Sequence, residues 1–233
     1  QKKWYEHWKE NRMKWHKSLG FSDDELRFHD HIKLAHYADA AADIEFKFPF
    51  GFKELEGIHS RTDFDLKQHE AHSKKKLRYF DPESNENYVP YVVETSIGLD
   101  RMFLALFSNA LNEEKLEDGT SRVVLNIPAP LAPIKVAVLP LVKKDGLPDK
   151  AREIMNLLKI EHQCHYEEKD SIGKRYRRQD AIGTPFCITI DHDTLEDNAV
   201  TIRERDTMKQ ERVSISELEA IINEKVNIKN IFI

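Results

Sequence analysis

Three prolines within six residues divide the sequence into two parts with different hydrophobic patterns. Pro128, Pro130 and Pro133 form a stiff connector, because a proline ring fixes the backbone and continues neither a helix nor a central strand. Alternating strand patterns and amphipathic helices come before the connector, whereas buried-type strands alternate with helices after it. We therefore predict two domains, residues 1–127 and 134–233, joined by a connector at 128–133.

The second part has the pattern of a layered α/β domain. Strands are expected at 136–139, 164–167, 186–190, 200–205 and 211–215, and helices at 147–158, 172–181 and 215–226. Strands that alternate with helices favour a three-layer arrangement, in which helices cover both faces of a sheet.

The first part combines a predicted strand hairpin with several helices. Ile44, Phe46 and Phe48 alternate with polar residues, as in a half-buried strand, and a turn at 49–51 leads to a partner strand at 52–58. Helices are expected at 1–19, from Ser22 or Asp23 to before His36, at 62–75 and at 98–111, strands at 77–80 and 89–96, and a loop or hairpin at 112–122.

The first helix carries Trp4, Trp8, Trp15 and Leu19 on one face, since they recur at helical spacing. We predict that this face packs into the core; stacking of the tryptophans on RNA bases is the alternative.

Composition and charge restrict the function classes. The chain is 40% hydrophobic and 33% charged with a net charge of −5, so a nucleic-acid partner needs a local basic patch. No apolar run is long enough to span a bilayer. Cys164 and Cys187 form no CxxC pair, which favours a reducing cytoplasmic location and argues against zinc. The start at Gln1 resembles neither an initiating methionine nor a signal peptide, so we expect a longer parent chain.

A strand that runs directly into a helix carries the first chemical pattern. Glu94 and Ser96 share one strand face, where a carboxylate and a hydroxyl can hold an ammonium group. Gly98 allows close approach at the junction, and the free N–H groups of the new helix attract an anion. Arg101 in the first turn can grip phosphate oxygens with its guanidinium fork. Taken alone, the same pattern also fits an ordinary helix start with a solvated arginine.

Acidic residues on the earlier hairpin form a second pattern. Glu45, Glu54 and Glu56 can hold Mg²⁺ with phosphates, or an ammonium group, and Arg61 can order them by ion pairing. The alternative is the solvated face of a half-buried hairpin. The histidines at 59, 69 and 72 fit no usual zinc spacing, so we expect no protein metal site.

A basic segment in the second part forms the third pattern. Residues 174–180 contain four cations and one anion, a local charge of +3, with Tyr176 among them as a candidate base-stacking ring. Arg203 and Arg205 share one face of a later strand. A solvated helix face with internally paired arginines remains the alternative.

Three segments together resemble one enzyme family. The run Glu-Thr-Ser-Ile-Gly-Leu-Asp-Arg at 94–101 resembles motif 3 of class II aminoacyl-tRNA synthetases in the form used by glycyl enzymes. Residues 43–66 resemble the hairpin that follows motif 2 in glycyl-tRNA synthetases, and 134–140 with 173–185 resemble the anticodon-binding domain of glycyl, histidyl, prolyl and threonyl enzymes. The resemblance implies an α+β fold, the C-terminal part of an antiparallel-sheet catalytic domain, followed by a three-layer α/β anticodon-binding domain with a mixed sheet.

The resemblance also implies roles for individual residues. It makes Arg101 and Glu54 catalytic, with Arg101 on the γ-phosphate of ATP, and it places Glu94 and Ser96 at the glycine ammonium. The implied glycine contacts are Glu94, Thr95, Ser96, Ile97 and Gly98. The implied ATP contacts are Glu54, Leu55, Gly98, Leu99, Asp100 and Arg101. The implied tRNA contacts are Lys174, Arg175, Arg178, Arg203 and Arg205.

The implied parent enzyme activates glycine with ATP and Mg²⁺, transfers it to tRNA(Gly), and forms a homodimer in the cytoplasm. Motifs 1 and 2 would precede Gln1, so we expect these 233 residues alone to be inactive in glycine activation. One alternative is a non-catalytic nucleic-acid-binding protein resembling the accessory subunit of mitochondrial DNA polymerase, which the intact Glu94, Ser96 and Arg101 disfavour. Another is a prolyl or histidyl enzyme, which the Glu-Thr-Ser form of motif 3 and the Asp-Phe-Asp-Leu run at 63–66 disfavour.

Overall fold

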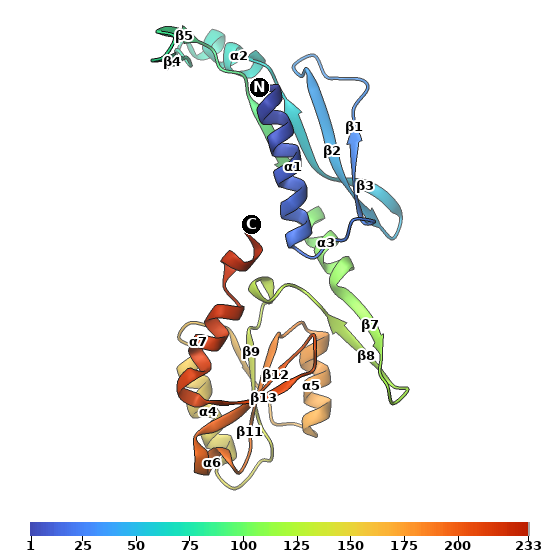
Figure 1. Cartoon of the computed structure of the whole chain (residues 1–233), viewed down its shortest axis with the longest axis vertical. Coiled ribbons are helices and arrows are strands. Elements are labelled where there is room, and N and C mark those ends of the chain that lie inside the picture. The colour runs from blue at the N-terminus through green and yellow to red at the C-terminus, as the bar shows by residue number, and fades with distance from the viewer. Residues whose placement is uncertain (233) are drawn as a thin grey trace. The chain divides into compact units, whose positions relative to one another are not determined.

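The computed structural model describes residues 1–232, which form two compact units (Figure 1). The first unit spans Gln1–Ser108, and the second begins at Asn109. This division lies before the prolines because a hairpin of β7 (Leu111–Lys115) and β8 (Ser121–Leu125) packs on a helix of the second unit. The predicted domain limits at 127 and 134 stay a prediction.

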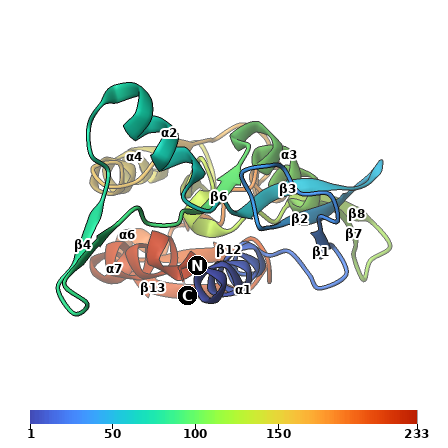
Figure 2. The ribbon, with the colours of Figure 1, turned by 90° about the horizontal axis from the view of Figure 1, so that it is seen from above.

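The first unit is built on an antiparallel sheet, as the sequence predicted. The strand order is β1 (Leu26–Asp30), β2 (Ala40–Phe48), β3 (Gly51–Ser60) and β6 (Val93–Ile97). Helix α1 (Lys2–Ser18) runs along one face of this sheet in both views (Figures 1 and 2). Buried Ile44 and Ile58 belong to the core of this unit.

A β-bulge interrupts the pairing of β2 with β3. Ile44 lies opposite Glu56 and Glu45 opposite Glu54, so Leu55 is an extra residue without a partner. A bulge breaks the strict alternation of a strand and turns the side chains on its two sides in different directions. Glu54 and Glu56, which the sequence placed on one strand face, therefore have different surroundings.

Two expectations about the N-terminal region were wrong. The short helix predicted from Ser22 or Asp23 is a turn followed by β1, where Leu26 pairs with Phe46, because β2 offers a complete backbone partner. The predicted core packing of the tryptophan face is wrong for its first two members: the exposed fractions of Trp4 and Trp8 are 58% and 41%, whereas Trp15 is half-buried and Leu19 is buried. The helix instead buries Tyr5 and His16.

An arm leaves the sheet between β3 and β6. It consists of α2 (Phe64–Ser73) and a hairpin of β4 (Tyr79–Asp81) and β5 (Glu86–Tyr88), and it extends away from the sheet in both views (Figures 1 and 2). The chain then returns through β6 and enters α3 (Leu99–Ala110).

The second unit is a three-layer domain on a mixed five-stranded sheet, as predicted. The strand order is β10 (Cys164–Tyr166), β9 (Val136–Pro140), β11 (Phe186–Ile190), β12 (Ala199–Glu204) and β13 (Gln210–Ser214). β9 pairs in parallel with both of its neighbours, and the remaining pairs are antiparallel.

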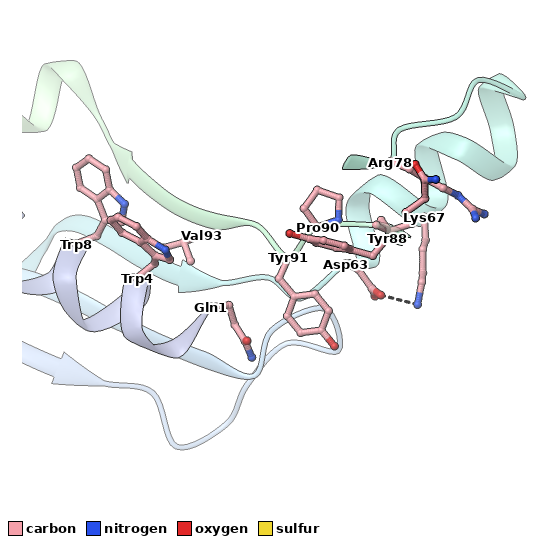
Figure 3. A pocket seen from close by; sticks show the side chains of 12 residues that line it. Gln1, Trp4, Trp8, Asp63, Lys67, Arg78, Tyr88, Pro90, Tyr91 and Val93 are labelled. Atoms are coloured by element: carbon pink, nitrogen blue, oxygen red, sulfur yellow. Dashed lines mark ion pairs between the residues drawn. The ribbon is translucent and has the colours of Figure 1, made fainter. Parts of the chain in front are cut away.

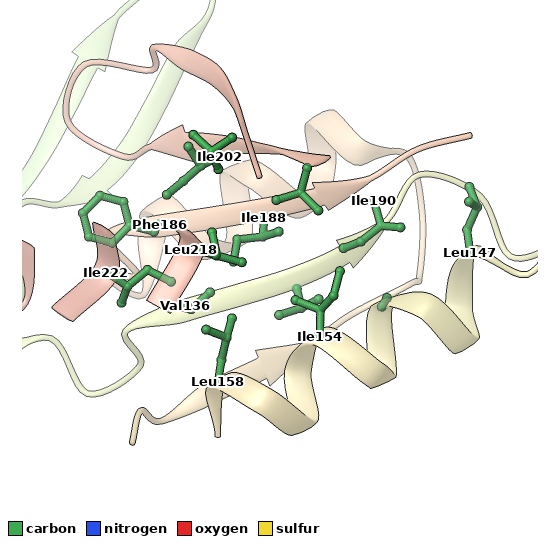
Figure 4. Packing of buried hydrophobic residues seen from close by; sticks show 14 residues of the cluster. Val136, Leu147, Ile154, Leu158, Phe186, Ile188, Ile190, Ile202, Leu218 and Ile222 are labelled. Carbon is green, nitrogen blue, oxygen red and sulfur yellow. The ribbon is translucent and has the colours of Figure 1, made fainter. Parts of the chain in front are cut away.

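Helices cover both faces of that sheet. α4 (Leu147–Leu158) and α7 (Ile215–Lys225) bury Ile154, Leu158, Leu218 and Ile222 against one face (Figure 4). α5 (Ile172–Ala181) packs on the other face through Ile172 and Tyr176. The short helices are η1 (Ala129–Leu131), α6 (Thr194–Asp197) and η2 (Ile228–Ile231). Within residues 1–232, no helix combines the length and the apolar character that crossing a membrane requires.

Candidate functional site

The face of the first sheet opposite α1 carries a row of polar residues. On β6 and β3, Ser96 lies opposite Gly57 and Glu94 lies opposite His59. Asp43 on β2 continues the row, because it lies opposite Gly57. Strand alternation therefore places Glu94 and Ser96 on one face, as the sequence predicted.

Gly57 is explained by the packing of this row. A Cβ atom at position 57 would lie 2.7 Å from Cε1 of His59, so only glycine leaves room for the ring. The imidazole Nδ1 of His59 lies 3.9 Å from Oε2 of Glu94. On the far side of the row, Nε2 of His31 lies 2.8 Å from Oδ2 of Asp43.

Arg61, the residue after β3, holds Glu94 in place. Its Nη1 donates to Oε2 of Glu94 at 2.7 Å, and its Nε donates to Oδ2 of Asp65 at 2.6 Å. The guanidinium also lies over the ring of Tyr37, 4.2 Å from the centroid. The hydrogen bonds to Asp65 and Glu94 raise the pKa of Arg61, and Arg61 in turn lowers the pKa of Asp65. Arg61 therefore orders Glu94 rather than the strand glutamates Glu54 and Glu56.

The six residues assigned to ATP by resemblance lie together. They line one open cavity of about 690 Å³: Glu54, Leu55, Gly98, Leu99, Asp100 and Arg101. Nη1 of Arg101 donates to the backbone oxygen of Glu54 at 2.8 Å and lies 3.6 Å from Oε2 of the same residue. Both side chains are about half exposed, so a guanidinium and a carboxylate face a solvent-filled space at the start of α3.

The side chains of β6 divide between the two faces of the sheet. Thr95 lies opposite Ile58 and Ile97 opposite Glu56, so both point away from the face of Glu94 and Ser96. Of the five residues assigned to glycine, Glu94 and Ser96 can therefore offer side chains to one ligand. Thr95 and Ile97 can offer backbone groups there.

The other two strand glutamates do not line the cavity. Glu56 is 1% exposed and accepts hydrogen bonds from Nε of Arg12 at 2.5 Å and Nε2 of His16 at 2.7 Å, both on α1. Burial raises the pKa of Glu56, but these two partners outweigh it and lower the pKa below its ordinary value. Glu45 pairs with Arg27 at 2.6 Å. Both are structural ion pairs of the sheet.

Three of the five arginine and lysine residues assigned to tRNA are buried in the second unit. Arg175 is 1% exposed and donates to the backbone oxygens of Pro140, at 2.7 Å, and of Glu167 and Leu141. Burial lowers its pKa. Arg205 is equally buried and donates to the oxygens of Gly183 and Ile127, each at 2.8 Å.

Asp180 on α5 joins the remaining buried arginines. It is fully buried and accepts two hydrogen bonds from Arg203, at 2.7 and 3.0 Å, and one from Arg122 of β8 at 3.1 Å. Tyr176 is also engaged internally, since its hydroxyl lies 2.6 Å from that of Thr189 and Arg203 lies over its ring. These contacts hold α5 and the β7–β8 hairpin on the sheet.

The exposed cations of this segment are fewer than the sequence suggested. Lys174 is exposed, and Arg178 is partly exposed in ion pairs with Glu167 at 2.5 Å and Asp170 at 3.0 Å. Arg175, Arg203 and Arg205, in contrast, lie inside the unit, where the carbonyls and carboxylates of this chain already occupy their guanidinium groups.

Comparison with known proteins finds relatives for most of the chain. Residues 135–225 match the family described as anticodon binding domain. The chain is 54% identical over 202 residues to the glycine–tRNA ligase of Chlorobaculum tepidum, which covers 86% of this chain and 43% of the relative. Over most of its own length, the chain is therefore similar to glycine–tRNA ligases. The enzymes of Acetivibrio thermocellus and Clostridium tetani are 51% and 53% identical over 204 residues, covering 87% of this chain and 44% of each relative.

The chain spans less than half the length of the relatives that it matches. The structure also adds residues to which the sequence analysis assigned no role in a site. His59 lies beside Glu94, and its signal is its place two residues after Gly57 on β3. Arg122 reaches Asp180 across 58 positions of sequence, for which no local signal exists. Among residues 1–232, no group of three or more potential ligands has the arrangement of a metal site.

Proposed function

We propose that this chain is the C-terminal part of a ligase that activates glycine with ATP and transfers it to tRNA(Gly). The observation that carries the proposal is the placement of Arg101 against Glu54 around one cavity, at the end of the strand that presents Glu94 and Ser96. One strand–helix junction thus presents a guanidinium that can bind phosphate and a strand face that can bind an ammonium group.

Arg101 is the proposed charge stabiliser. When glycine attacks the α-phosphate of ATP, negative charge accumulates on the departing pyrophosphate, and a fixed guanidinium stabilises that charge without reorganising. The contact of Arg101 with the backbone of Glu54 holds the guanidinium at the cavity. Mg²⁺ enters with ATP, and the half-exposed carboxylate of Glu54 would share it with the phosphates and water, because Mg²⁺ needs few protein ligands. We propose no zinc in this site.

Glu94 and Ser96 are the proposed ligands of the glycine ammonium group. The carboxylate neutralises the ammonium charge, and the hydroxyl oxygen accepts a hydrogen bond from an ammonium N–H group. Arg61 is a positioning residue, since it fixes one oxygen of Glu94 and leaves the other for the substrate. Thr95 and Ile97 would contribute backbone groups, and Gly98 gives the substrate close access to the strand end.

The second unit is the proposed binder of the tRNA anticodon. Lys174 and Arg178 are the proposed phosphate contacts, because both are accessible and the ion pairs of Arg178 are exposed enough to exchange for phosphate. Arg175, Arg203 and Arg205 would act indirectly by holding α5 and β12 in place. Binding through so few surface cations should weaken only moderately with salt, because the slope of log affinity against log salt scales with the number of phosphate contacts.

The longer protein is proposed to be a cytoplasmic homodimer with this activity. Since the chain covers less than half of its relatives, we expect the 233 residues alone to bind tRNA but to catalyse no glycine-dependent exchange between ATP and pyrophosphate.

The test uses the longer protein that contains this chain. It should charge tRNA(Gly) with glycine, and a panel of amino acids should give no comparable charging with proline or histidine. Binding of primer–template DNA in preference to tRNA, with no charging, would instead support the polymerase-accessory alternative. The intact register of Glu94 and Ser96 beside Arg101 favours the ligase.

A further inference from the structure

A second cavity lies on the α1 side of the first sheet, apart from the ATP site. Its volume is about 870 Å³, and it lies between the N-terminal half of α1, the beginning of α2 and the segment that returns to β6 (Figure 3). Its aromatic lining is Trp4, Trp8, Tyr88 and Tyr91. We call this cavity the aromatic groove; it shares no lining residue with the cavity of Arg101.

The rings of the aromatic groove are unusually accessible for their size. Trp4 and Trp8 lie beside Val93 at one end, Tyr91 lies on the segment that returns to β6, and Tyr88 lies at the end of β5 (Figure 3). Each of the four rings is exposed by 40% or more. Burial of a large aromatic side chain is favourable, so four exposed rings in one cavity forgo that stabilisation. Exposed aromatic faces of this kind are the platforms on which unpaired nucleic-acid bases stack.

The other end of the aromatic groove is basic. Lys67 and Arg78 line it, and the adjoining arm adds Lys74, Lys75 and Lys76. Residues 67–80 contain these five cations and one anion, Glu70, so the segment carries a charge of +4 within a chain of net charge −5. Lys67 and Arg78 form ion pairs with Asp63 and Glu70, but both cationic side chains are more than half exposed. Such exposed pairs are weak, so both cations are available to bind phosphate.

The position of the aromatic groove connects it with the glycine site. Val93 in the groove directly precedes Glu94, and Asp63 follows Arg61 by two residues. A ligand in the groove therefore lies at the edge strand whose opposite face carries the proposed amino-acid ligands. Among the parts of a tRNA, the acceptor end must come to this strand, because glycine is attached there.

We propose that the aromatic groove binds single-stranded RNA, namely unpaired nucleotides at the acceptor end of the tRNA. The bases stack on Trp4, Trp8 and Tyr91, and the phosphates meet Lys67 and Arg78. This assignment rests on the proposed function, since it names the part of the tRNA that the first unit holds. It is distinct from anticodon binding by the second unit.

The first test titrates this chain with a five-nucleotide single-stranded RNA and follows tryptophan fluorescence. All three tryptophans lie on α1 and two line the groove, so stacking should quench the emission. Tyr91→Ala should weaken binding about five- to 150-fold, the range for one stacked base. The matched control is Phe50→Ala, an exposed ring elsewhere in the unit, which should bind like the unaltered chain.

The cations are tested through the salt dependence of the same titration. Lys67→Ala combined with Arg78→Ala should reduce the slope of log affinity against log salt by about 1.4, or about 0.7 per lost phosphate contact. Lys14→Ala combined with Lys47→Ala removes two exposed lysines outside the groove and should leave the slope unchanged. Equal affinities and slopes for groove and control variants would overturn the proposal.

The second test places the same variants in the longer protein. We expect Tyr91→Ala and the Lys67–Arg78 pair to raise KM for tRNA while glycine-dependent pyrophosphate exchange, which needs no tRNA, stays unchanged. Lower exchange and lower thermal stability at an unchanged KM for tRNA would show that another part of the protein covers the groove, and would refute the proposal. If the proposed function itself fails, the unaltered protein shows no exchange, whereas quenching by RNA is still measured directly.

Discussion

Arg61 donates a hydrogen bond from Nη1 to Oε2 of Glu94 over 2.7 Å, and a second one binds its Nε to Asp65. The arginine thus connects the end of β3, the start of α2 and the carboxylate on β6. A carboxylate fixed in this way meets a small ammonium group without first losing rotational freedom, which is the physical meaning of preorganisation.

Replacing Arg61 should therefore weaken glycine binding in the longer protein. In Arg61→Gln, Glu94 loses a charge-assisted hydrogen bond, and we expect KM for glycine to rise about tenfold or more while KM for ATP changes little. Pyrophosphate exchange at varied glycine and ATP measures both constants. Arg27→Gln breaks the comparable pair with Glu45 on the same sheet and should alter neither KM. Equal changes in both constants would mean that Arg61 acts on the fold as a whole.

The buried pair of Glu56 with α1 should make the first unit sensitive to acid. Glu56→Gln leaves Arg12 and His16 without their charged partner, and we expect a loss of about 3 kcal/mol in the free energy of unfolding at pH 7. The pKa of Glu56 is lowered in the folded state, so its stabilisation is present above the ordinary glutamate pKa of about 4.3 and is lost as the pH falls through the folded value.

Urea unfolding followed by tryptophan emission measures this effect, because all three tryptophans are on α1. The difference between the unaltered chain and Glu56→Gln should be largest at neutral pH and shrink below about pH 4.3. A difference that is constant from pH 7 to pH 3.5 would contradict the assignment of the stabilisation to the ionised carboxylate.

Asp180 should be essential to the second unit. Asp180→Asn leaves the buried Arg203 without its carboxylate partner and Arg122 with Glu114 alone, and we expect it to destabilise the unit by about 3–5 kcal/mol. Asp170→Asn, which affects the exposed pair with Arg178, should cost less than about 1 kcal/mol. Urea unfolding followed by circular dichroism compares the two variants; similar losses would show that the network around Asp180 carries little stability.

The local parts of the structure were predictable from the sequence. Residues 94–101 determine a strand, a glycine and a helix start by their own pattern, and strand alternation alone places Glu94 with Ser96. The bounds of α4, α5 and β11 follow equally well from local periodicity. The meeting of Glu54 with Arg101 was expected from family resemblance, and residue spacing by itself would not have indicated it.

The sequence pattern was uninformative where distant segments decide the surroundings of a side chain. Glu56 has the same residue type and spacing as a site residue, but the bulge at Leu55 and a helix 40 or more positions earlier make it a core ion pair. Arg203 and Arg205 look like a basic surface until Asp180 and the carbonyl of Gly183 are brought to them by folding. Local charge does not reveal such partners.

The two cysteines should be unreactive in the folded chain. Burial raises the pKa of Cys164 to about 11 and that of Cys187 to about 12, so almost no thiolate is present at pH 8. We expect a thiol-specific chromogenic reagent to react slowly with the native chain. In urea, both thiols should react immediately. Unfolding releases protons from these thiols at high pH, because their pKa values fall when the chain unfolds. The free energy of unfolding should therefore decrease above about pH 9. Rapid labelling of the native chain at pH 8 would contradict this account.

The central claim is that the cavity beside α3 holds ATP while Glu94 and Ser96 hold glycine, and pyrophosphate exchange by the longer protein tests it most directly. We predict exchange that depends on glycine, and a fall of about 10²–10³ in kcat for Arg101→Ala with the fold intact, because one fixed charge-stabilising group is removed. Exchange that depends on a different amino acid, or that proceeds unchanged in Arg101→Ala, would contradict it.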